Sequence, residues 1–125
     1  MGISGRKKLR DLNPQVRPAA EWLVTLAAAQ GWDVRITSVL RSMREQDMLY
    51  QDWIRGRRVL PAAKPGCSQH QYGLAFDMVI AEDMNGPLQR AIGGAWQQIG
   101  GSWAGPTDPV HYGVFWTRPS GCGTT

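Results

Sequence analysis

The 125-residue chain has few of the residues from which metal and nucleophilic sites are commonly built: it has two histidines and two cysteines. Its longest apolar run, residues 22–29, is far shorter than the roughly 18–20 residues that a membrane-spanning helix needs. The basic residues near the N-terminus are followed by Asp11, Asn13 and Pro14, where a secretory signal has an apolar segment. We therefore expect a chain that is made in the cytoplasm without a signal peptide and has no membrane span.

The scarcity of cysteine and histidine also limits the kinds of site. Zinc-finger spacings and the usual RNA-binding signatures are absent, so we expect no nucleic-acid partner. Two cysteines in a chain without a signal favour free thiols, although a bridge from Cys67 to Cys122 stays an alternative. The apolar content of 42% and six tryptophans argue against disorder. The length favours one domain over residues 1–125. We also expect the protein to be a monomer.

Charge is distributed unevenly along the chain. Residues 1–64 hold 12 of the 14 Lys and Arg and 6 of the 10 Asp and Glu, a net charge of +6, and residues 65–125 have a net charge of −2. We expect residues 1–17 to form a basic N-terminal arm that is solvated and partly disordered over residues 1–11. The basic half either helps the protein to associate with anionic envelope polymers or only keeps it soluble.

The hydrophobic pattern predicts an α+β domain with a small antiparallel sheet. Helices are expected over residues 21–30, 42–55 and 88–99, and strands over 33–40, 73–80 and 110–116. Ser42 and Glu45 have the spacing of a capping box at the start of the second helix. The side chains expected on the buried face of this helix are Gln46, Leu49, Tyr50 and Trp53. Residues 117–125 are rich in Gly, Ser and Thr and are expected to form a flexible tail.

The strand over residues 73–80 carries a carboxylate on an unusual face. Leu74, Phe76, Met78 and Ile80 alternate toward the core, whereas Gly73, Ala75 and Asp77 point the other way. Because Gly and Ala leave space around Asp77, this face favours a site over a solvated surface. His70 lies in the turn before the strand, and Gly73 permits a bend that brings the imidazole toward Asp77. His and Asp are suitable zinc ligands.

A second segment, residues 108–113, can complete such a site. His111 can supply a third ligand, and Asp108 can stay outside the ligand set, close to a water molecule. Three protein ligands and a water are the arrangement of a catalytic zinc site, in which the metal lowers the pKa of the water to about 7. From the residues alone, a set of Cys67, His70 and His111 competes with this one. Surface or turn roles for His70, Asp108 and His111 also stay open.

These residues form a recognisable pattern. Ser68-x-His70-x-x-Gly73-x-Ala75-x-Asp77, followed by Asp108-x-x-His111, resembles the M15 family of zinc DD-peptidases. That family includes D-alanyl-D-alanine carboxypeptidases, D-Ala-D-Ala dipeptidases and phage L-alanyl-D-glutamate endolysins. Ser38-Val39-Leu40-Arg41-Ser42 resembles the family's Ser-Gly-x-Arg-Ser segment, with Leu40 where a Gly is usual. Residues 63–66 and the Gly-Gly-x-Trp at 100–103 resemble the endolysin branch, so the resemblance covers roughly residues 20–116.

The resemblance implies a Hedgehog/DD-peptidase-like zinc peptidase fold and a role for each matching residue. It implies that His70, Asp77 and His111 bind one Zn²⁺ and that Asp108 is the catalytic base. Asp108 stands where the carboxypeptidase and dipeptidase branches have Glu. Arg41 would stabilise oxyanion charge or anchor a substrate carboxylate. The expected substrate-binding residues are Ser68, Arg41, Gln46 and Tyr72.

The function that follows is hydrolysis of the peptidoglycan stem peptide, at the L-Ala–D-Glu bond, by a phage-type endolysin. Such a protein would reach the cell wall after holin-type release or lysis. One alternative is a D-alanyl-D-alanine carboxypeptidase or dipeptidase. Another is a zinc-containing module on the same fold that binds the cell wall without cleaving it. The presence of both Asp108 and Arg41 argues against the binding module, because a protein that only binds needs no base.

Overall fold

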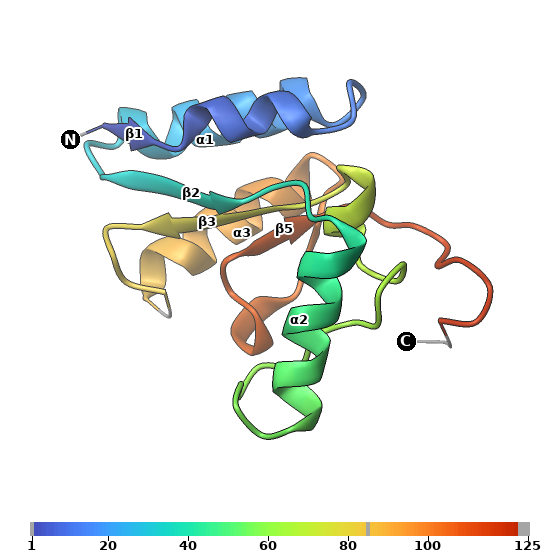
Figure 1. The fold of residues 1–125 in the computed structure, drawn as a ribbon. Coiled ribbons are helices and arrows are strands. Elements are labelled where there is room, and N and C mark those ends of the chain that lie inside the picture. Colours follow the sequence, from blue (N-terminus) through green and yellow to red (C-terminus); the bar gives the residue numbers. More distant parts are fainter. Residues whose placement is uncertain (1, 85, 123–125) are drawn as a thin grey trace.

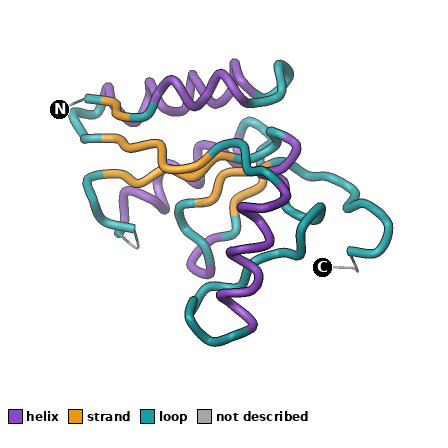
Figure 2. The backbone as a smooth tube through the Cα atoms, viewed as in Figure 1, coloured by secondary structure: helices purple, strands orange, loops and turns teal. Residues whose placement is uncertain are grey.

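The computed structural model describes residues 2–84 and 86–122. Figures 1 and 2 show short strands beside longer helices, joined by loops. In chain order, the helices and strands are β1 (Ile3–Ser4), the 3-10 helix η1 (Arg6–Asp11), α1 (Arg17–Ala29), β2 (Val34–Ser38), α2 (Met43–Ile54), the 3-10 helix η2 (Gln69–Tyr72), β3 (Phe76–Ile80), α3 (Pro87–Gln98), β4 (Ser102–Trp103), the 3-10 helix η3 (Gly105–Thr107) and β5 (His111–Gly113). The predicted α+β class is confirmed. No helix within the described residues is both long and apolar enough to cross a membrane.

The strands form one sheet in the order β1-β2-β3-β5-β4. β2, β3, β5 and β4 pair antiparallel, as predicted, and β1 adds to the edge in parallel with β2. The predicted strands at 73–80 and 110–116 are longer than the observed ones, because a 3-10 helix precedes β3 and the chain leaves the sheet after Gly113. The central strand of the sheet is β3, which carries the residue Asp77.

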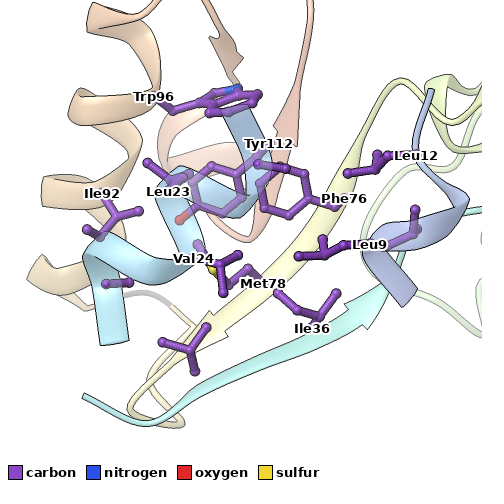
Figure 3. Packing of buried hydrophobic residues seen from close by; sticks show 14 of the residues in the cluster. Leu9, Leu12, Leu23, Val24, Ile36, Phe76, Met78, Ile92, Trp96 and Tyr112 are labelled. Carbon is purple, nitrogen blue, oxygen red and sulfur yellow. The ribbon is translucent and has the colours of Figure 1, made fainter. Parts of the chain in front are cut away.

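One face of the sheet is covered by α1 and α3, and the core lies between them and the strands. Figure 3 shows Leu23 and Val24 of α1 and Ile92 and Trp96 of α3 around the strand side chains. Phe76 stacks on Tyr112 with ring centroids 5.3 Å apart. The core-facing residues of β3 are Phe76, Met78 and Ile80, which confirms the predicted alternation. Trp103 lies so close to Gly93 of α3 that a Cβ there would come within 2.3 Å of its ring, which explains a glycine inside this helix.

Helix α2 is held mainly by its N-terminus. Ser42 accepts a hydrogen bond from the backbone of Glu45, and Glu45 accepts one from the backbone of Ser42, so the predicted capping box is confirmed. The predicted buried face is wrong except at Gln46, which is 1% exposed. Leu49 and Tyr50 are half-buried and Trp53 is exposed, because α2 extends away from the sheet (Figure 1).

The N-terminal segment is part of the fold, which corrects the expectation of a partly disordered arm. Residues Ile3–Ser4 pair with β2, and Leu9 of η1 and Leu12 are buried in the core. The backbone N–H of Asn13 donates to the carbonyl of Gly73, 2.9 Å away. The basic side chains of this segment point outward, whereas its two leucines anchor it.

The two cysteines form a disulfide, which corrects the expectation of free thiols. Cys67 precedes η2 and Cys122 lies in the tail, and the bridge closes a sequence separation of 55 residues. The tail over residues 117–122, expected to be flexible, is thus tied to the body of the protein. The rest of the expected tail, residues 123–125, lies outside the described residues.

Candidate metal centre and substrate cavity

The register of β3 and β5 places two of the predicted ligands side by side. Phe76 is opposite Tyr112 and Asp77 is opposite His111 in this antiparallel pair. Since side chains alternate along a strand, the first pair enters the core and the second projects from the other face of the sheet. Asp77 and His111 therefore meet on the face that α1 and α3 leave uncovered.

His70 reaches the same point from the 3-10 helix before β3. The Ser68 hydroxyl accepts from the backbone N–H of His70, and Gln71 completes a capping box with Ser68. Gly73 ends this helix with a φ of +67°, and a Cβ there would lie 2.9 Å from Asn13 N and Asp11 O. This turn brings the imidazole toward β3, as predicted. Ala75, which was expected to face open space, is buried instead.

Three ligand atoms converge on this face of the sheet. His70 Nε2 lies 3.0 Å from Asp77 Oδ1, and His111 Nδ1 lies 3.4 Å from the same oxygen. Among the described residues, His70, Asp77 and His111 form the group whose ligand atoms all lie within 4.8 Å of one another. These are the three residues that the sequence predicted.

The hydrogen bonds around His70 show that the site fits a cation. His70 Nδ1 is 2.8 Å from the carbonyl of Val39, which can only accept, so Nδ1 carries a proton. In a neutral imidazole, Nε2 then presents a lone pair toward the carboxylate oxygen of Asp77. Two lone pairs at this separation need a proton or a metal ion between them. Two imidazoles and a carboxylate are a donor set suited to zinc.

The competing ligand set from the sequence is excluded by the structure. Cys67 is bonded to Cys122 and offers no thiolate.

Asp77 is held in its position by charge as well as by the sheet. Burial by itself raises the pKa of its carboxyl. When protons and not a metal ion lie between the three groups, hydrogen bonds from His111 and His70 and their charges outweigh burial and hold the pKa well below its usual range. Its second oxygen, Oδ2, lies 3.1 Å from Arg41 Nη2. Asp77 is therefore an ionised carboxylate whose two oxygens have different partners.

Arg41 is the centre of a hydrogen-bond network at the start of α2. Its Nε donates to Ser38 Oγ at 3.2 Å and its Nη1 donates to Gln46 Oε1, also at 3.2 Å. Gln46 in turn donates to the carbonyl of Ala63, 2.8 Å away. Burial lowers the pKa of Arg41, although the guanidinium stays protonated in any aqueous buffer. The two residues expected to contact substrate, Arg41 and Gln46, thus also connect the metal centre to the loop after α2.

Asp108 lies next to the metal centre without joining it. It is half-buried, and its carbonyl accepts from the backbone N–H of His111 at 3.1 Å. Burial raises the pKa of the Asp108 carboxyl and the charge of Asp77 adds to this, while His111 opposes the shift. A carboxylate with a raised pKa is a better proton acceptor than an ordinary one.

All these groups line one cavity of about 1020 Å³. Its lining includes His70, Asp77, Asp108 and His111, together with Arg41, Gln46 and Ser68. The predicted Tyr72 is not among the lining residues. Its hydroxyl donates to the carbonyl of Gly66, and its ring packs on Trp116, with centroids 5.7 Å apart. Tyr72 therefore supports the tail instead of facing this cavity.

Sequence reasoning missed part of the cavity wall. Phe115 and Trp116, which follow β5, line it together with Arg118 of the tail and Arg58 of the loop after α2. Gln69 holds the segment that leads to the tail, since its amide donates to the carbonyl of Val114 and accepts from the backbone N–H of the same residue at 3.1 Å. No local sequence signal marks these residues, because their proximity depends on the disulfide and on the path of two loops.

The fold and the site define the class of the protein. The family model for VanY, D-alanyl-D-alanine carboxypeptidase, matches residues 9–98, and the chain belongs to this family. This confirms the resemblance to M15 zinc peptidases.

Individual relatives extend the comparison. The chain is 42% identical over 71 residues to the peptidoglycan L-alanyl-D-glutamate endopeptidase CwlK of Bacillus subtilis (strain 168), a match that spans 56% of this chain and 42% of that relative. Among solved structures, the zinc-bound E175A mutant of the vancomycin-resistance D,D-pentapeptidase VanY from the VanB-type cassette has a TM-score of 0.64. It is 19% identical, with 82% of this chain and 72% of that chain covered.

Two further structures share the fold. The LD-carboxypeptidase LdcB has a TM-score of 0.64 and 16% identity, with 82% of this chain and 58% of that chain covered. The L-Ala D-Glu endopeptidase ChiX of Serratia marcescens has a TM-score of 0.55 and 18% identity, with 87% and 84% covered. The predicted α+β zinc-peptidase fold is thereby confirmed.

Proposed function

We propose that the protein is a zinc-dependent peptidase that hydrolyses the stem peptide of peptidoglycan at the L-Ala–D-Glu bond. The observation that carries the proposal is the convergence of His70, Asp77 and His111 in a cavity that Asp108 and Arg41 also line. The choice of bond is supported by the 42% identity to an L-alanyl-D-glutamate endopeptidase.

His70, Asp77 and His111 would hold one zinc ion. Such an ion supplies positive charge that polarises the scissile carbonyl and makes a water molecule more acidic. Asp108 accepts a proton from the attacking water and passes it to the leaving amine, a role suited to its raised pKa. Arg41 holds Asp77 Oδ2 and brings positive charge to the cavity where oxyanion charge develops. Ser68 and Gln46 form part of the wall against which the peptide lies.

A second candidate is a D-alanyl-D-alanine carboxypeptidase, which the family model favours. Digestion of purified peptidoglycan followed by mass analysis distinguishes the two. Cleavage at L-Ala–D-Glu releases peptides that begin with D-Glu, whereas the carboxypeptidase releases free D-Ala. Zinc-loaded protein that sediments with peptidoglycan but releases neither product overturns both and leaves a wall-binding module.

The proposal includes an endolysin role outside the cytoplasmic membrane, with release of the monomeric protein by a holin-type route. The disulfide between Cys67 and Cys122 supports action in an oxidising compartment such as the periplasm. The basic half of the chain would help it to associate with anionic envelope polymers, an attraction that salt should weaken. Turbidity loss of outer-membrane-permeabilised Gram-negative cells, with and without chelator, tests this role. A loaded enzyme that cleaves purified peptidoglycan but leaves such cells intact contradicts it.

A further inference from the structure

Besides Arg41, the cavity is lined by Arg58, most of whose hydrogen-bonding capacity is unused. Arg58 lies in the loop after α2 and is half-buried. Its Nε donates to the carbonyl of Leu60, 3.1 Å away, a contact that holds the side chain against its own loop. This contact leaves the two terminal nitrogens of the guanidinium, with four N–H groups, for other partners.

Arg58 differs in this respect from the other arginine at the metal centre. All three nitrogens of Arg41 have protein partners: Ser38, Gln46 and Asp77. Within residues 2–84 and 86–122, the structure pairs Arg58 with no carboxylate. A half-buried guanidinium without a counter-ion is a strong site for an anion, because a carboxylate can accept two parallel hydrogen bonds from its fork.

The charge of Arg58 acts on the reaction site itself. It lowers the pKa of Asp108, against the raising effect of burial, and it adds to the effect of burial in lowering the pKa of Arg41. The Arg58 guanidinium is thus near both the proposed base and Arg41. An anion bound between Arg58 and the metal centre would relieve the repulsion between the two arginines.

We propose that Arg58 binds a carboxylate of the stem peptide close to the scissile amide and thereby sets the preference of the enzyme for acidic substrates. This assignment rests on the proposed function. The carboxylate has two possible sources. A D-Glu residue has two carboxyl groups, one of which stays free when the other continues the chain. A carboxypeptidase substrate offers its C-terminal carboxylate instead.

Paired substrates test the assignment. One pair is an L-Ala–D-Glu stem peptide with the free D-Glu carboxylate either intact or converted to a carboxamide. The other is a stem pentapeptide with a free or an amidated C-terminus. We expect the wild type to prefer the acid in one pair by about 10- to 100-fold in kcat/KM, and Arg58→Gln to reduce that preference to within about threefold. Arg58→Lys should keep part of it. The pair that responds identifies the source of the carboxylate.

Control variants and a binding assay separate the possible failures. Arg55→Gln removes the same charge from an exposed position near Arg58 that does not line the cavity, and it should retain the full preference. The assignment is overturned if Arg58→Gln lowers kcat/KM equally for acid and amide, or if it changes neither. It is also overturned if Arg118→Gln alone loses the preference. Calorimetric binding of the D-Glu-containing product peptide and its amide needs no cleavage. If the protein binds the acid more tightly than the amide but hydrolyses neither, only the proposed function is contradicted. If neither assay distinguishes the acid from the amide, the role of Arg58 is overturned.

Discussion

Arg41 and Asp77 divide the two oxygens of one carboxylate between two tasks. Arg41 Nη2 lies 3.1 Å from Oδ2, so Oδ1 is the oxygen that faces His70 and His111. Groups that hydrogen-bond to a metal ligand fix its orientation and typically affect metal affinity by about 10- to 100-fold. Arg41 therefore orients Asp77 of the candidate metal centre, in addition to the role toward the substrate that we propose for it.

We predict that Arg41→Gln weakens zinc binding by about 10- to 100-fold, since Asp77 Oδ2 loses its charged partner. Competition with a zinc-binding dye measures the change. Arg44→Gln, which alters an exposed arginine in the next helix, is the matched control and should bind zinc like the wild type. Unchanged affinity in Arg41→Gln would mean that the sheet alone orients Asp77.

Asp108→Ala should retain zinc and lose hydrolysis. Because Asp108 lies outside the ligand group, its removal leaves the three ligands in place. General bases typically contribute about 10²- to 10⁴-fold, and we expect a loss of kcat in that range. Zinc content and kcat, measured on the same preparation, check both parts. Near-normal hydrolysis by Asp108→Ala would falsify the base assignment.

His70→Ala should lose both zinc and activity, unlike Asp108→Ala. The side chain is 2% exposed and supplies a ligand atom, so its removal also leaves a small cavity. Circular dichroism establishes whether the variant is folded, and metal analysis gives its zinc content. A folded His70→Ala protein with a full complement of zinc would show that the metal lies elsewhere.

Replacing both Cys67 and Cys122 by serine should lower the free energy of unfolding by about 2–4 kcal/mol. The bridge closes a long loop, and its loss gives the unfolded chain more conformational freedom. It also releases the tail, which holds the segment with Phe115, Trp116 and Arg118 along the cavity wall. Urea denaturation measures the stability. Identical midpoints for the double variant and the oxidised wild type would contradict a stabilising bridge.

Tyr112 should make the protein sensitive to alkali. Burial raises the pKa of its phenol, whose hydroxyl donates to Gln89, well above the ordinary value of about 10. The folded state therefore holds this proton more tightly than the unfolded state. The resulting stability is complete below about pH 10 and declines as the pH rises above that value.

A comparison with Tyr112→Phe isolates this effect. The variant lacks the hydrogen bond to Gln89 and should be less stable than the wild type at pH 8. Its disadvantage should shrink as the pH rises above about 10, because it has no phenol to ionise at this site. Urea denaturation at a series of pH values measures the difference in stability between the two proteins. The titration of the other tyrosines and of the lysines is common to both and cancels in this difference. A difference that does not change with pH contradicts the buried phenol as the cause.

The residues of the candidate metal centre could be predicted from sequence because most of the information that places them is local. Alternation along one strand separates Asp77 from Phe76 and Met78, and the motif spacing supplies His70 and His111. The antiparallel register then brings Asp77 opposite His111. The first two steps need only a few neighbouring residues, and the third follows once the two strands pair.

The parts that could not be predicted depend on contacts distant in sequence. Leu9 is buried in the core, although four basic residues stand close to it in the sequence and their charges suggested a solvated arm. The helical spacing of Leu49 and Trp53 is real, but α2 extends away from the sheet, so Leu49 lines the cavity and Trp53 is exposed. The pairing of Cys67 with Cys122 and the place of Arg58 in the cavity depend on the paths of the tail and of a long loop.

The central claim is that a metal ion held by His70, Asp77 and His111 is required to cut the stem peptide. The most direct measurement is a zinc titration of chelator-stripped protein with purified peptidoglycan, followed by mass analysis of the released peptides. We predict no cleavage without zinc, peptides that begin with D-Glu as zinc is added, and a plateau at one zinc per chain. Cleavage by the stripped protein at the rate of the loaded protein would contradict the claim, as would a loaded protein that releases no peptide.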